Sequence, residues 1–70
     1  MGPTNLAKKA GKNLKRAIKT SKYHNKKDFA IAISESVMVV DKWIMFGIDD
    51  FNTLNRISSV LEVSVYTLLS

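Results

Sequence analysis

The chain has 70 residues, a formal net charge of +5 and no cysteine, which excludes disulfides and thiolate metal sites. Its single histidine, His24, excludes a metal site built from several histidines. A chain of this length forms one small domain that relies on helix packing or self-association for stability. No apolar run reaches the roughly 18 residues that cross a bilayer, and no apolar segment of the secretory type follows the basic start. We therefore expect a cytoplasmic protein without membrane contact, cofactor or metal.

The charges divide the chain into two parts. Residues 1–27 hold nine lysines or arginines and no acid, whereas residues 28–70 hold two basic and six acidic residues, a formal charge of −4. This division favours a basic arm for a polyanion, while a solvated lysine-rich helix is the plainer alternative. We expect residues 1–12 to form the arm, frayed because Gly11 weakens a helix by about 1 kcal/mol relative to alanine. Residues 13–70 would then form the folded domain, and the cations of the arm region are Lys8, Lys9, Lys12, Lys15 and Arg16.

The first two predicted helices follow from a period near 3.6 in the apolar residues. A helix over about residues 5–22 places one apolar stripe on its inner face, made of Leu6, Ala10, Leu14, Ala17 and Ile18. Asn25 then caps a second helix that runs to about Ile33, and Asp28 occupies the position of the acid in a capping box. Phe29, Ala30 and Ile33 supply the inner face of this second helix.

Three more helices are predicted in the acidic part of the chain. Ser34 or Ser36 caps a third helix that directs Val40, Trp43 and Ile44 inward and ends at Gly47. Asp49 or Asp50 caps a fourth helix, for which the predicted inner stripe is Phe51, Leu54, Ile57 and Leu61. Ser64 caps a short fifth helix, "VYTLL". Five short helices with brief connections predict a compact all-α domain.

Two stretches of the sequence resemble a known family. "KKDFAIAISESVMVVDKW" is similar to the helix-turn-helix of the Cro/CI-type family, also called the XRE or lambda-repressor-like family. "FNTLNRISSVLEVSVYTLL" is similar to the closing part of that family, with "LEVS" in place of its leucine–glycine–valine–serine turn. The resemblance covers about residues 13–69 and implies a five-helix lambda-repressor-like fold, with the helix-turn-helix at about residues 26–46. It is far more specific for the fold than for the ligand.

The resemblance also implies which residues would contact DNA. The third helix would enter the major groove, and the starts of the second and third helices would approach phosphates. Lys26, Lys27 and Ser36 would lie near the backbone. The residues carried over to the groove are Ser36, Val37, Met38, Asp41 and Lys42.

The chain departs from the family pattern in the turn and in the groove-facing set. Lys26 stands where glutamine is common, Ser34 replaces the turn glycine, and Glu35 replaces an apolar residue. Base edges are read mainly by Arg, Lys, Asn and Gln, and only Lys42 and Ser36 offer comparable donors here. The apolar residues Val37 and Met38 fit thymine methyl groups. Asp41 can accept from a cytosine amine but is repelled by phosphates.

Two functions remain open at this stage. One is a small Cro-like repressor of a phage or mobile-element switch, which binds operator double-stranded DNA as a dimer. About five phosphate contacts would then give a slope near −4 to −5 for log affinity against log salt. The other is an anti-repressor, or modulator of repression, that binds a partner repressor protein. The predicted interface for that partner comprises Val37, Met38 and Met45, and Tyr66 and Leu69 near the end of the chain could finish the core or form a homodimer seam.

No pattern in the sequence favours an enzymatic activity. His24 is a lone histidine in a turn, and Ser34 and Ser36 have no base nearby in the sequence. Asp49 and Asp50 are better explained as helix caps than as a catalytic carboxylate pair. No glycine-rich phosphate loop is present.

Overall fold

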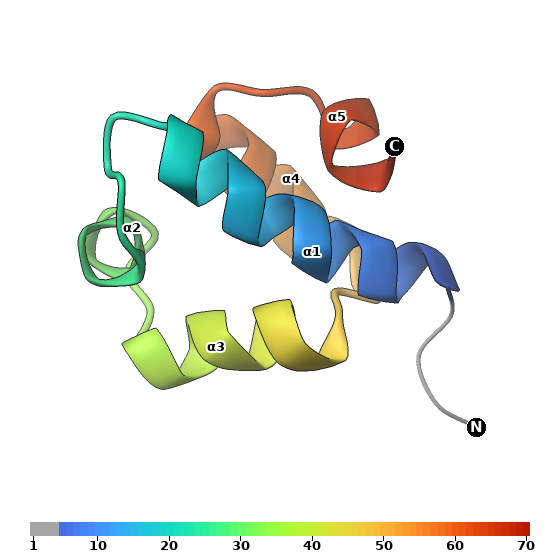
Figure 1. Cartoon of the computed structure of the whole chain (residues 1–70), viewed down its shortest axis with the longest axis horizontal. Coiled ribbons are helices and arrows are strands. Elements are labelled where there is room, and N and C mark those ends of the chain that lie inside the picture. Colours follow the sequence, from blue (N-terminus) through green and yellow to red (C-terminus); the bar gives the residue numbers. More distant parts are fainter. Residues whose placement is uncertain (1–4) are drawn as a thin grey trace.

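The computed structural model describes residues 5–70, which form five helices and no strand (Figure 1). The helices are α1 (Asn5–Thr20), α2 (Lys26–Ala32), α3 (Val37–Phe46), α4 (Phe51–Leu61) and α5 (Val65–Leu69). Long α1 packs against α3 and α5, while α2 contacts α3 and α4 contacts α5. The expected all-α class is confirmed. The first four residues of the expected arm lie outside the described residues.

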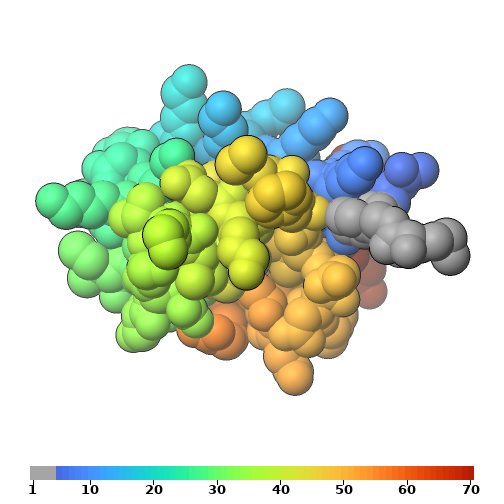
Figure 2. All heavy atoms as spheres, turned by 90° about the horizontal axis from the view of Figure 1, so that it is seen from below, coloured from blue at the N-terminus to red at the C-terminus, as the bar shows by residue number. Residues whose placement is uncertain are grey.

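The five helices enclose one apolar core and leave α3 in the middle of one face (Figure 2). The radius of gyration is 10.7 Å, close to the roughly 11 Å expected for a compact chain of this length. Every helix contributes to the core, whose largest fully buried side chains are Leu14, Phe29, Val40, Ile57 and Leu68. The inner side of α3 is therefore held by the core, and the other side of this helix faces solvent.

Polar side chains begin four of the helices. Asn25 Oδ1 accepts the backbone N–H of Asp28 at 2.8 Å, and Ser36 Oγ accepts that of Val39 at 3.2 Å. Asp50 and Ser64 do the same for α4 and α5. Of the paired alternatives in the sequence, the caps are Ser36 rather than Ser34 and Asp50 rather than Asp49. Hydrogen bonds from the hydroxyl and then the backbone N–H of Thr53 lower the pKa of the Asp50 carboxyl.

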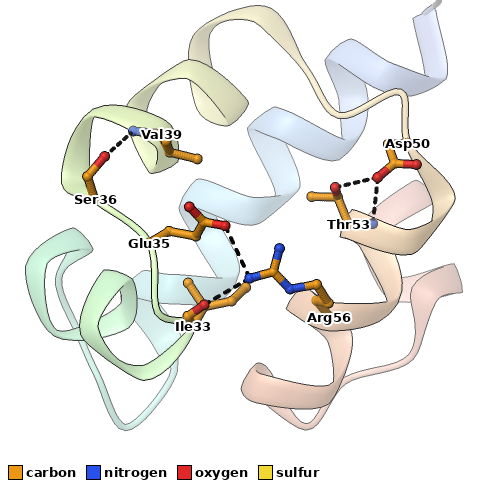
Figure 3. A network of polar contacts seen from close by, with 7 residues as sticks. All are labelled: Ile33, Glu35, Ser36, Val39, Asp50, Thr53 and Arg56. Atoms are coloured by element: carbon orange, nitrogen blue, oxygen red, sulfur yellow. Dashed lines mark hydrogen bonds and ion pairs between the residues drawn. The ribbon is translucent and has the colours of Figure 1, made fainter.

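The turn between α2 and α3 is closed by backbone and side-chain contacts (Figure 3). Ser34 is left-handed at φ 61°, and the N–H groups of Ser34 and Glu35 donate to the carbonyls of Ile31 and Ala30, the pattern of a Schellman cap. Arg56 of α4 reaches across to donate to the Ile33 carbonyl at 3.0 Å and to the Glu35 carboxylate at 3.2 Å. In Figure 1, α2 is seen end-on and α3 from the side, so their axes cross steeply.

Residues 5–12, which belong both to the expected arm and to the helix expected over about residues 5–22, form the first half of α1. Ala7 and Ala10 are buried, and the backbone N–H of Ile48 donates to the Ala7 carbonyl at 3.0 Å. Gly11 is buried where α1 crosses the end of α3. A Cβ atom at this position would lie 2.4 Å from the Trp43 carbonyl oxygen. Gly11 is thus a contact point between helices rather than only a weak place in one helix.

Two apolar residues predicted on inner stripes are exposed. Phe51 is 63% exposed, whereas Leu54, Ile57 and Leu61 of the same helix are buried. At 100° per residue, Phe51 lies about 85° from the centre of that buried stripe. Leu6 is 57% exposed for the same geometric reason, since Ala7 and Gly11 take the inner positions on α1. The prediction that Phe51 belongs to the core was wrong.

Candidate nucleic-acid interface

The side of α3 opposite the core is a continuous exposed surface, which we name the outer face. Its residues are Val37, Met38, Asp41, Lys42 and Met45. Val40 is fully buried and Trp43 and Ile44 are half-buried against the core, so the helix cannot rotate without losing these contacts. Met38 is 79% exposed and Met45 is 72% exposed. The structure thus brings together the α3 residues that the sequence assigned to the DNA groove and to the protein interface.

The one acid on the outer face is paired. Lys26 Nζ, at the start of α2, lies 2.6 Å from Asp41 Oδ1. Both side chains are about half exposed, so this ion pair adds little to stability. Its effect is local, because Lys26 compensates the charge that Asp41 would otherwise present to a polyanion. Lys26 was predicted as a phosphate contact and Asp41 as a base contact, and the structure joins them to each other.

The exposed side of α1 carries six cations, which we name the cationic ridge. Its members are Lys8, Lys9, Lys12, Lys15, Arg16 and Lys19. At 100° per residue they fall within about a third of the helix circumference and extend over about 16 Å. The first turn of α1 has no acid, and within residues 5–70 none of the six forms an ion pair. The ridge is therefore a concentrated positive surface without local compensation.

One side of the cationic ridge, at Lys15 and Lys19, borders the outer face of α3. A hollow of about 580 Å³ separates them, lined on the α1 side by Lys15 and Lys19 and on the α3 side by Asp41 and Met45. Figure 2 shows the side chains of α1, coloured blue to cyan, projecting along one edge of the face that α3 forms. The sequence placed Lys15 in the arm region, but only the packing of α1 on α3 brings it beside the outer face.

Comparison with known proteins gives no match. No protein-family model, no curated protein and no solved structure shows significant similarity to the chain. The interpretation of this surface therefore depends on its own chemistry.

The remaining predicted backbone contacts lie at the starts of α2 and α3. Lys27 is exposed and has no ion pair among residues 5–70. Ser36 is exposed, and its hydroxyl oxygen caps α3 while its O–H is available as a donor. Because α3 is ten residues long, its first free N–H groups add a partial positive charge at this end.

Other surfaces differ in composition from the ridge. Phe46 and Phe51 are 61% and 63% exposed where α3 ends and α4 begins, and the exposed acids Asp49 and Asp50 lie between them in the chain. Near the end of the chain Tyr66 is 83% exposed, whereas Leu69 is half-buried against the core. Tyr66 is thus free for a contact between copies, while Leu69 mainly completes the core.

Within residues 5–70, no helix is long and apolar enough to cross a membrane. The same residues contain no group of three His, Cys, Asp or Glu side chains that could hold a metal ion.

The sequence contained no signal for several of these arrangements. Lys26 and Asp41 are 15 positions apart, and Arg56 lies 23 positions from the carbonyl it contacts, so neither pair has a helical spacing. Lys19 was not assigned to a site. The run of cations on α1 could have identified it, because Lys15 and Lys19 are four residues apart and share one side of a helix.

Proposed function

We propose that the chain is a small helix-turn-helix transcription regulator that binds duplex operator DNA. In this proposal α2 and α3 form the helix-turn-helix, α3 lies in the major groove, and the cationic ridge follows the adjacent phosphate backbone. The observation that supports it most is the position of the uncompensated ridge beside the outer face of α3, across the hollow lined by Lys15, Lys19 and Met45. Phosphate contacts supply affinity and orientation, and the groove-facing helix supplies selection.

The charge of the outer face is compatible with this role. The Lys26–Asp41 pair offsets the single acid, which leaves Lys42 as the free charge of the outer face. Lys27 and the start of α3 supply two further attractions for phosphates. These groups add to the attraction that the ridge supplies, and Lys26 beside Lys27 lines the same hollow as the ridge residues Lys15 and Lys19.

A second candidate function is that of an anti-repressor or modulator, which binds a partner repressor protein. The specific observation in its favour is the number of large apolar side chains around α3, because Phe46 and Phe51 add to Met38 and Met45. Exposed apolar surface of this kind is typical of protein interfaces. Asp49 and Asp50 beside it would suit a basic partner and repel phosphates.

One selection experiment separates the two functions. The chain is incubated with a pool of random duplexes, bound DNA is amplified and sequenced, and the experiment is repeated with a variant carrying Val37→Lys and Met38→Lys. If α3 reads DNA, the natural chain enriches a defined sequence. The variant binds duplexes more tightly at low salt but without selection, because two cations replace the apolar contacts.

Ile31→Lys is the matched control, since Ile31 is 69% exposed on α2 and outside the outer face. It adds a cation and keeps the enriched sequence. A natural chain that enriches no sequence contradicts the DNA proposal. The partner-protein function then predicts that the double lysine variant loses binding to a purified basic repressor, while Ile31→Lys keeps it.

A further inference from the structure

The outer face of α3 is nearly devoid of the groups that usually read bases. Asp41 is paired with Lys26, and Ser36, just before this face, uses its hydroxyl oxygen as a cap and keeps only its O–H as a donor. Lys42 is the one free charged donor on this face. What the face presents instead is apolar, with Met38 at 79% exposure and Met45 at 72%. Its chemistry therefore fits an apolar feature of the ligand.

Duplex DNA offers one such feature in the major groove, the 5-methyl group of thymine. Cytosine, adenine and guanine carry no methyl group there, and their distinguishing features are hydrogen-bonding atoms. A long, polarisable methionine side chain adapts to a methyl group without needing one fixed geometry. The feature of the major groove that suits the apolar outer face is thus the methyl group of thymine.

The spacing of the two methionines adds a geometric constraint. Met38 and Met45 are seven residues apart, so they lie within about 20° of each other on the helix and about 10 Å apart along its axis. Base pairs repeat every 3.4 Å along the duplex. When α3 lies along the groove, the two side chains are therefore about three base pairs apart.

We infer that the outer face of α3 selects DNA through two thymine methyl groups about three base pairs apart, contacted by Met38 and Met45. The inference rests on the proposed function and names its specificity. The cationic ridge holds the backbone without regard to sequence, and Met38 and Met45 are the specificity-determining residues.

The test removes single methyl groups from the DNA. A duplex enriched by selection is remade with deoxyuridine at one thymine at a time, which deletes the methyl group and keeps the base pair. Two positions about three base pairs apart each lose about fourfold in affinity, the value of one buried methyl group. Deoxyuridine at any other thymine changes the affinity by less than about twofold.

The variants assign each position to a side chain. Met38→Ala removes the effect of deoxyuridine at one of the two positions, and Met45→Ala removes it at the other. Ile31→Ala, outside the outer face, keeps both effects. The inference is overturned if an enriched duplex binds and tolerates deoxyuridine everywhere, or if both methionine variants keep the full pattern. If no duplex is enriched at all, the proposed function fails first and the inference with it.

Discussion

At the scale of single residues, three non-glycine residues hold left-handed backbone, His24, Ser34 and Glu62. Glu62 ends α4 at φ 57° and ψ 40°, where the N–H of Val63 donates to the Ser58 carbonyl at 3.0 Å. This is the Schellman geometry in which glycine is usual, because a Cβ atom is unfavourable in left-handed backbone. Glutamate at this position of "LEVS" thus has a structural cost.

Glu62→Gly is expected to raise the free energy of unfolding by about 1 kcal/mol, since it relieves this conformation and Glu62 makes no side-chain hydrogen bond or ion pair among residues 5–70. Urea denaturation followed by circular dichroism measures the change. Glu62→Ala is the control, because alanine keeps the Cβ atom and brings no gain. A Glu62→Gly protein no more stable than Glu62→Ala would refute this explanation.

The position of a single side chain also explains why α3 carries an acid. The sequence shows Asp41 beside predicted base contacts and gives no reason for it. The structure supplies the partner, because Lys26 lies 2.6 Å away from the preceding helix. Such a pair cannot be inferred from periodicity, since it depends on how steeply α2 and α3 cross.

At the scale of elements, α1 changes the interpretation of the chain most. Composition alone divides it into a basic arm and an acidic body, but α1 is one helix from Asn5 to Thr20 with buried Ala7, Ala10 and Leu14. The lysines therefore belong to the exposed side of a core helix. Gly11 makes this packing close, because its missing side chain leaves room for the Trp43 and Ile44 carbonyls.

Gly11→Ala is expected to destabilise the fold by about 1–3 kcal/mol, although alanine is the better helix former by about 1 kcal/mol. The added Cβ atom would meet the Trp43 and Ile44 carbonyl oxygens at 2.4 and 2.9 Å, and both belong to backbone. Thermal and urea unfolding measure the effect. Ser59→Ala, at an exposed position of α4, is the control and leaves stability unchanged or slightly higher. A stabilised Gly11→Ala protein would disprove the close approach of α1 and α3.

The positions where helices begin were the part of the fold that the sequence predicted best. Asn25, Asp50 and Ser64 all cap helices, as local sequence signals indicate, because capping depends only on neighbours three residues away. Phe51 shows the limit of such signals. It is apolar and three residues before Leu54, yet it is the first residue of α4 and lies about 85° from the centre of the buried stripe.

At the scale of the whole molecule, charge and apolar surface are arranged around α3. The cationic ridge lies along one edge, and Phe46, Phe51 and the acids between them lie where α3 ends. The sequence identified Met38, Lys42 and Met45 on α3, because helical spacing places them on one side. It could not place α1 beside them, since that depends on contacts between residues far apart in the chain.

The most direct test of the proposed interface is the salt dependence of binding to a duplex obtained by selection. Fluorescence anisotropy at several salt concentrations is expected to give a slope near −4 to −5 for log affinity against log salt, from about five phosphate contacts. A variant with Lys12→Gln, Lys15→Gln and Lys19→Gln should reduce the magnitude of that slope by about 3. Glu62→Gln, which changes the net charge without removing a cation of the ridge, should leave it unchanged. A flat slope for the natural chain, or an equal slope for the triple variant, would contradict DNA binding through the ridge and α3.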